Sequence, residues 1–309
     1  MAERNPDLAV PVALGPRLAP AFALEAWSRL LRFLRREPLT AACAFIFVAI
    51  VIVAIFAPWI ATHDPLAGDP RARLQGPSAD HFFGTDAIGR DVFSRVVYGA
   101  RVSLLVGVAA TLAGTVIGAI IGLITGYLGG TVDLLVQRVM DGIQAIPALV
   151  FLLLVAAIWQ QGMLSVVVVL AVLIAPYVSR LVRGVVLSLR EEAFVLAAQA
   201  MGARPLRIMM VHILPNTLAP VLVAASIIAG GAMLAEGALS FLGLGIPPDD
   251  PLWKTSWGAM LKPENLQYFE RSPYLVLFPG AALALTVLAV NVLGDSARDR
   301  LDPRLRGTL

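Results

Sequence analysis

Six long apolar runs dominate this sequence and constrain its fold more than any other feature. Each is about as long as the roughly 20 residues that an α-helix needs to cross the hydrocarbon core of a bilayer. The expected spans are 41–60, 102–127, 133–160, 164–182, 217–241 and 274–293. Of all residues, 58% are hydrophobic and 15% are charged, whereas soluble domains carry roughly 25% charged residues. The sequence therefore predicts an all-α polytopic membrane protein with six transmembrane helices.

Few residues of this chain offer covalent, redox or metal chemistry. The single cysteine, Cys43, excludes an intrachain disulfide and a cysteine cluster for zinc. The three histidines, His63, His81 and His212, are scattered, so we interpret them as hydrogen-bonding or loop residues and predict no metal site and no cofactor. No GxxxxGK[ST] phosphate-binding loop occurs, which predicts that the chain does not hydrolyse ATP itself. The basic residues lack interleaved aromatic residues, so no nucleic-acid partner is expected.

Small and special residues predict local details of the helices. Glycines at 114, 118, 122 and 126 recur every fourth residue along the second span, a spacing that allows close contact between helices in lipid. Asp91 is expected to cap a helix that begins on the membrane interface. In the third span, Pro147 is expected to introduce a kink, and Arg138 is expected to pair with Asp141 three residues on.

The longest polar interruption in the second half of the chain is 188–216, SLREEAFVLAAQAMGARPLRIMMVHILPN. Ser188 and Glu191 fit a capping box, which predicts that a short helix begins there. Gly202 suits the left-handed residue that closes such a helix. The apolar face is expected to hold Phe194, Ala197, Ala198 and Met201.

A second short helix is expected directly after this corner. Pro205 suits its first turn, and Pro215 is expected to end it. Its apolar face is expected to hold Leu206, Met209, Met210 and Ile213. Helices this short are marginal in water, so both must dock on something.

This stretch resembles the EAA loop of ABC-importer membrane subunits, whose pattern is Glu-Ala-Ala, three residues, Gly, nine residues, Ile-x-Leu-Pro. Ala197, Ala198, Gly202, Leu214 and Pro215 match it in register, while Leu196 replaces the Glu and His212 replaces the Ile. Both departures resemble the dipeptide, oligopeptide and nickel branch of the family. Motifs similar to those of the C-type subunit in that branch follow in family order: FGTDAIGRDVFSR at 83–95, RVMDGIQAIP at 138–147 and EGALSFLGLGIPP at 236–248.

The resemblance implies a type I ABC importer permease fold and a membrane-spanning subunit of an ATP-driven importer for small peptides or a related solute. It also implies four kinds of partner: a homologous second permease, two ATPase subunits that bind the ATP, an extracytoplasmic substrate-binding protein and the lipid bilayer. In the family this loop is a coupling helix that enters a cleft on the ATPase. The residues implied in coupling are Glu191, Glu192, Ala197, Ala198, Gly202, Ala203, Leu214 and Pro215. The two alanines are expected to present a flat face to the ATPase. The alternative is an interfacial helix pair that lies on lipid.

The distribution of basic residues predicts the orientation of the chain in a bacterial inner membrane. With both termini in the cytoplasm, inner segments carry sixteen basic residues and outer loops carry eight, although five of those eight lie in the first outer loop. The expected domains are a cytoplasmic tail with a basic amphipathic segment (1–36), a first span with a periplasmic loop (37–99), the permease domain (100–296) with its coupling loop (188–216), and a basic cytoplasmic tail (297–309).

Candidates for the substrate pathway are few. Glu236 is the strongest ionisable candidate inside a span, and the alternative, which we favour, is that it lies partly wet at the outer end of the fifth span. Gln144, Ser226 and Asn291 are further candidates, and interhelical hydrogen bonding is the preferred alternative for each. The second functional hypothesis is an ion-coupled secondary transporter, which would need buried carboxylates and broken helices in repeat-related positions. A third is a membrane scaffold without transport.

Overall fold

The computed structural model describes residues 37–159, 161–247, 253 and 255–301. The expected N-terminal tail, with its basic segment, and residues 302–309 of the expected C-terminal tail lie outside this part of the chain. The chain divides into two compact units, 1–42 and 43–309. In the first unit, the Ala41 N–H donates to the Glu37 carbonyl at 2.9 Å in the first turn of helix α2 (Pro38–Ile55).

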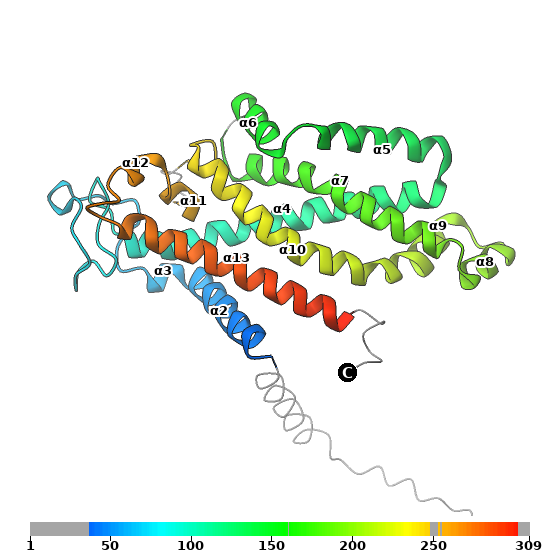
Figure 1. The fold of residues 1–309 in the computed structure, drawn as a ribbon, viewed down its shortest axis with the longest axis horizontal. Coiled ribbons are helices and arrows are strands. Elements are labelled where there is room, and N and C mark those ends of the chain that lie inside the picture. The colour runs from blue at the N-terminus through cyan, green and yellow to red at the C-terminus, as the bar shows by residue number, and fades with distance from the viewer. Residues whose placement is uncertain (1–36, 160, 248–252, 254, 302–309) are drawn as a thin grey trace, which may run out of the picture. The chain divides into compact units, whose positions relative to one another are not determined.

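Long apolar helices make up most of the described chain (Figure 1). Five are long and apolar enough to cross a membrane: α2, α4 (Val92–Leu128), α7 (Met163–Leu189), the run Pro205–Phe241 that ends in α10 (Leu214–Phe241), and α13 (Tyr274–Leu301). A sixth span results if α5 (Gly130–Ala145) and α6 (Ala148–Ile158) are counted together, although 88° separates their axes. The all-α prediction is confirmed, and among the described residues only two isolated β-bridges, in the loop before α4, interrupt it.

Pro147 breaks the expected third span instead of kinking it. Ile146, the residue before it, is extended at φ −82° and ψ 126°, as steric conflict with a following proline favours. Helix α5 therefore ends at Ala145 and lies along α7 (Figure 1). There the Arg183 guanidinium donates to both carboxylate oxygens of Asp133, at 2.5 and 2.6 Å.

The expected pair between Arg138 and Asp141 is wrong. Asp141 instead approaches Arg180 of α7, with 3.9 Å between the carboxylate oxygen and the guanidinium nitrogen. The i, i+3 spacing permits a pair within one helix, but α5 packs on α7 and brings another arginine to the same carboxylate.

The glycine stripe on α4 confirms the predicted close contact and shows its partner. A Cβ placed at Gly118 would lie 2.5 Å from the Ala175 carbonyl oxygen of α7, and one at Gly122 would lie 2.4 Å from the Ser179 carbonyl oxygen. Only glycine permits two helix backbones to approach this closely. The helices α4 and α7 therefore form the central pair of the 43–309 unit.

Helix α4 is longer than predicted and begins inside protein rather than on an interface. Asp91 caps it as expected, accepting the Ser94 N–H at 2.8 Å. From Val92 to Leu128 the helix is continuous, and Val92 and Val97 are buried. The short elements α3 (Ala57–Ile60) and α11 (Trp257–Met260) contact α4, and α12 (Pro263–Leu266) contacts α13. The Trp257 indole N–H, for example, donates to the Val96 carbonyl at 2.9 Å.

Candidate functional site

The corner between α7 and α10 begins later in the chain than the capping box predicted. Helix α7 runs on to Leu189, and α8 spans Ala193–Ala200 with Glu192 as its N-cap residue, whose side chain makes no capping hydrogen bond. Ser188 therefore lies inside the last turn of α7. The prediction was wrong because the apolar sequence before Ser188 continues the preceding helix without interruption.

The end of α8 matches the prediction. Gly202 has φ +77°, in the left-handed region that favours glycine. The Ala203 N–H donates to the Ala198 carbonyl at 3.0 Å and the Gly202 N–H to the Gln199 carbonyl at 2.9 Å. These two bonds form a Schellman motif, which satisfies the last carbonyls of the helix and turns the chain sharply.

Pro205 opens the next helix as predicted, but Pro215 does not end it. Helix α9 (Pro205–Arg207) passes into a π-helical turn, η2 (Ile208–Ile213), and then directly into α10. The Leu214 N–H donates to the Met209 carbonyl, five residues back. The wider π turn makes room for the ring of Pro215, which also has no N–H to leave unpaired. The corner is therefore continuous with a membrane-spanning helix.

The predicted apolar faces are buried only in part: Ala198, Met209 and Ile213 pack inward, whereas the larger share of both faces is exposed. Val195, Ile208 and Ile213 are fully buried and Ala198 is 3% exposed, in one cluster with Leu123 of α4 and Val178, Val182 and Val186 of α7. Ala198 therefore belongs to the support of the corner and is not open to a partner, contrary to the prediction. Sequence reasoning missed Val195 and Ile208, because apolar residues on every side of α8 gave its pattern little contrast.

The opposite side of the corner is exposed and largely apolar. We call Phe194, Ala197, Met201, Leu206 and Met210 the corner surface. Met201 is 81% exposed, Leu206 66% and Met210 50%. Glu191, Glu192, Arg204 and Arg207 are exposed close to it in the chain. Of the other residues implied in coupling, Gly202 and Pro215 are exposed, while Ala203 and Leu214 are half-buried.

Glu236 lies in a polar cluster between three elements, and its predicted partial exposure is wrong. Its side chain is fully buried and accepts hydrogen bonds from Ser240 at 2.7 Å and from Ser103 of α4 at 3.3 Å. The Ser103 hydroxyl also accepts the backbone N–H of Trp257 at 3.3 Å. Ser256, the N-cap residue of α11, lies 3.3 Å from Ser240, hydroxyl to hydroxyl. The carboxylate thus ties α10 to α4 and, through the serines, to α11.

The three other pathway candidates do not converge on Glu236. Ser226 bonds back to the Val223 carbonyl at 2.7 Å and packs on Gly294 of α13, where a Cβ would lie 2.6 Å from its oxygen. Asn291 packs on Gly230 in the same way, at 2.5 Å. Gln144 is half-buried near the end of α5. Ser226 and Asn291 therefore lie at the contact between α10 and α13.

The described part of the chain is thus a set of long apolar helices with an exposed corner, packed on its inner side against α4 and α7, between two of the candidate spans. Residues 118–307 match the family of binding-protein-dependent transport system inner membrane components, and residues 25–77 match the N-terminal transmembrane domain of oligopeptide transport permease C. The chain belongs to this family, in the oligopeptide permease C branch. It is a multi-pass permease subunit of a binding-protein-dependent ABC importer, which rules out the ion-coupled alternative.

Curated relatives match over almost the full chain. The dipeptide transport system permease protein DppC of Alkalihalophilus pseudofirmus is 40% identical over 284 residues, which is 92% of each chain. The glutathione transport system permease protein GsiD of Shigella flexneri is 40% identical over 94% of this chain and 95% of its own. The probable peptide ABC transporter permease y4tQ of Sinorhizobium fredii is 43% identical over 88% and 91%.

The fold is also similar to a solved structure. A chain of the methionine ABC transporter MetNI, in inward-facing conformations, superposes with a TM-score of 0.54 at 20% identity, covering 68% of this chain and 97% of that one. At this identity the likeness supports the permease fold alone, and with it the predicted fold class.

Proposed function

We propose that this subunit forms a translocation pathway for small peptides together with a homologous second permease. Two ATPase subunits hydrolyse the ATP, and an extracytoplasmic binding protein delivers the substrate. The peptide class is supported by the names of the relatives, which transport dipeptides, glutathione and peptides. The ATP-driven step is supported by the family, whose members work in binding-protein-dependent systems.

We assign the contact with an ATPase subunit to the corner surface, and one observation carries this assignment. The surface exposes large apolar side chains, while the residues behind it are buried against α4 and α7. Apolar side chains that stand out from a rigid support are typical of a docking site. The exposed charges beside it would form the polar rim of such an interface.

The support explains how movement would be transmitted. Val195 and Ala198 hold α8 on the cluster that also contains the valines of α7, and η2 continues without a break into α10. A push on the corner surface would therefore move α7 and α10 together instead of bending a loose loop. ATP binding and hydrolysis would shift the population between outward-open and inward-open arrangements of the spans.

The proposed orientation places the corner in the cytoplasm and the loop before α4 on the outer side. Of the five basic residues that the sequence assigns to this outer segment, Arg71, Arg73 and Arg90 lie in the loop, whereas Arg95 and Arg101 lie in α4. Arg90 pairs with Asp86 at 2.7 Å, and the buried Arg95 lies 4.0 Å from the same carboxylate. Arg95 also donates to the Pro65 carbonyl at 3.2 Å. These contacts hold Arg90 and Arg95 in place, but the charge asymmetry stays as counted, because acidic residues contribute little to it.

Arginine substitutions at neighbouring alanines test the docking site. Ala197 is exposed, so Ala197→Arg leaves the fold intact but places a charge in the contact. An unpaired charge in a desolvated interface costs about 2–5 kcal/mol, a weakening of about 30-fold or more. We expect loss of co-purified ATPase and of ATP-driven uptake, with normal insertion. Ala67→Arg, an exposed position in the loop before α4, should keep the ATPase bound.

The variant Ala198→Arg shows what damage to the folded corner looks like, so that it can be told apart from the loss of docking expected for Ala197→Arg. It places the charge in the buried support, so we expect loss of the folded corner and a lower midpoint of thermal unfolding. If Ala197→Arg retains the ATPase as well as the unmodified chain does, the corner surface is not the docking site.

The peptide class is tested separately, by native mass spectrometry of the partner binding protein purified with its ligand. A non-peptide ligand would overturn this part of the proposal.

A further inference from the structure

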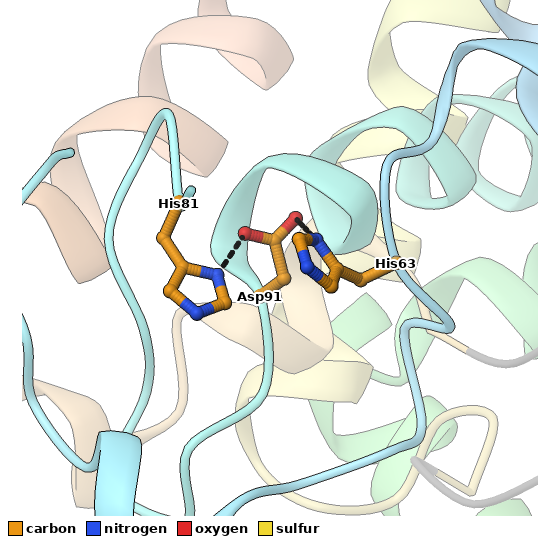
Figure 2. A group of neighbouring side chains, drawn as sticks. All are labelled: His63, His81 and Asp91. Carbon is orange, nitrogen blue, oxygen red and sulfur yellow. Dashed lines mark hydrogen bonds and ion pairs between the residues drawn. The ribbon is translucent and has the colours of Figure 1, made fainter. Parts of the chain in front are cut away.

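Two of the three histidines meet one aspartate in the loop before α4. His63 follows α3, His81 lies in the middle of the loop, and Asp91 caps α4, so the three residues come from three separate segments. Figure 2 shows Asp91 between the two imidazole rings, with one ring nitrogen of each directed at its carboxylate. The cluster lies in the 43–309 unit, at the opposite end of the helices from α8 (Figure 1).

The donor atoms of this cluster are already close to one another. His81 Nδ1 lies 3.0 Å from Asp91 Oδ1, and His63 Nδ1 lies 3.9 Å from Asp91 Oδ2. One ligand atom from each of the three residues lies within 4.8 Å of the other two. The ring centroids of His63 and His81 are also 4.8 Å apart. In a tetrahedral site with metal–nitrogen bonds of about 2.0–2.1 Å, neighbouring donors lie about 3.3 Å apart. The two distances from a histidine nitrogen to an Asp91 oxygen, 3.0 and 3.9 Å, fall on either side of this separation.

Surrounding hydrogen bonds hold the three residues in place. Asp91 Oδ2 accepts the Ser94 N–H at 2.8 Å and the Ser94 hydroxyl at 2.6 Å. The same hydroxyl accepts the His63 backbone N–H at 3.0 Å. The His81 backbone N–H donates to the Ser78 hydroxyl at 3.1 Å. Supporting contacts of this kind orient ligands in metal sites and reduce the cost of binding.

We propose that His63, His81 and Asp91 bind a divalent transition metal ion of the zinc class. Two imidazoles and one carboxylate form a ligand set that suits Zn²⁺, whereas Ca²⁺ and Mg²⁺ take oxygen ligands. The Asp91 side chain is 1% exposed and that of His81 16%, while that of His63 is 44% exposed. The site therefore opens to solvent on the His63 side, where the ion enters and a water completes the coordination.

Metal binding would add a link between side chains of three segments, whose backbones already meet in hydrogen bonds such as that from the Val92 N–H to the Gly84 carbonyl at 3.0 Å. The ion would connect the residues after α3 to the middle of the loop and to the first turn of α4. A ligand that binds the folded state alone stabilises it in proportion to its concentration and affinity. The consequence is a metal-dependent rigidity at the end of the helices opposite the corner. A hydrogen bond from His81 to Asp91 with no metal predicts no such dependence.

The test is metal binding by the full chain, purified in detergent with a tag that contains no histidine and then stripped with a chelator. Co²⁺ is titrated by its visible d–d absorption, and Zn²⁺ is then used to displace it. We expect one equivalent of metal, with affinity at least about tenfold lower in His63→Gln and in His81→Gln. Asp91→Asn keeps an N-cap oxygen and should also lose affinity. His212→Gln is the matched control, because His212 lies beside Phe194, with 6.5 Å between the ring centroids, and should bind normally.

Thermal unfolding provides the second measurement. Added Zn²⁺ should raise the midpoint for the unmodified chain and for His212→Gln, but not for His63→Gln or His81→Gln. Absence of stoichiometric binding, or equal binding by the His63 and His81 variants, would overturn the proposal. If a variant does not fold, X-ray absorption at the zinc edge of the unmodified chain decides: two imidazole nitrogens support the site, and an all-oxygen shell refutes it.

Discussion

Replacing two glycines in turn by alanine should change stability in opposite directions. Gly122 lies on α4 at the contact with α7, and Gly184 lies on α7 itself. A Cβ at Gly122 would lie 2.4 Å from the Ser179 carbonyl oxygen and 2.9 Å from Val182 Cβ. At Gly184 a Cβ would meet nothing within 4 Å. The same chemical change therefore meets a backbone in one case and open space in the other.

The magnitudes follow from this geometry. Heavy atoms in contact prefer about 3.5–4.0 Å, so at Gly122 the two helices must separate by about 1 Å, and overpacking of this kind costs about 1–3 kcal/mol. Gly184→Ala gains about 0.5–1 kcal/mol, because glycine inside a helix loses more backbone entropy on folding than alanine. We expect the two variants to differ by about 1.5–4 kcal/mol in the free energy of unfolding.

The assay is reversible unfolding of each purified variant in one detergent, followed by far-ultraviolet circular dichroism. Ser179 belongs to the same α7 turn that supports the corner, so Gly122→Ala should also reduce ATP-driven uptake. Equal stability of the two variants, or a more stable Gly122→Ala, would refute the assignment of the stripe to the contact between α4 and α7.

Three further predictions test other parts of the structure. Glu236→Ala should lower stability by about 2–4 kcal/mol through a cavity and unpaired hydroxyls, whereas Glu236→Gln, measured by thermal unfolding and uptake, should stay within about 1 kcal/mol and still transport. Gly202→Val should lose ATPase binding in co-purification, because a left-handed valine costs about 1–2 kcal/mol, while Gly202→Asn should keep it. In a chain without Cys43, an impermeant thiol reagent on intact cells should label Ala67→Cys and spare Ala200→Cys; the reverse pattern would invert the proposed orientation.

Features that depend on one short stretch of chain could be predicted from the sequence. The apolar runs predict the spans because their length has to match the bilayer, and the structure differs where Pro147 breaks the third run and where α4 begins earlier, at Val92. Gly202 could be placed because few residues other than glycine adopt the left-handed conformation that closes a helix. The glycine stripe identifies a close contact in the same way, although it does not say that α7 is the partner.

The two prolines at helix junctions show where local reasoning stops. Pro147 ends a helix and Pro215 does not, yet both follow an isoleucine or leucine in an apolar run. The difference lies in the preceding turn, which is α-helical before Pro147 and π-helical before Pro215. That π turn depends on Ile208 and Ile213 both packing inward against the cluster beneath α8, which is a tertiary contact. No property of Pro215 itself encodes it.

The faces of the corner could not be predicted for a related reason. In a soluble protein an apolar residue on a helix usually faces the core, so periodicity reports burial. Here lipid and partner subunits also take apolar side chains, and hydrophobicity loses that meaning. Phe194 is 43% exposed while Val195 beside it is fully buried. Size is the better guide. Val195 and Ala198 are small enough to let α8 approach α7, and the large side chains Phe194 and Met201 are exposed, where a partner would accommodate them.

The burial of Glu236 could not be predicted either. One of its polar partners, Ser103, lies on α4, far away in the sequence, so no local pattern around Glu236 could show that its carboxylate is enclosed.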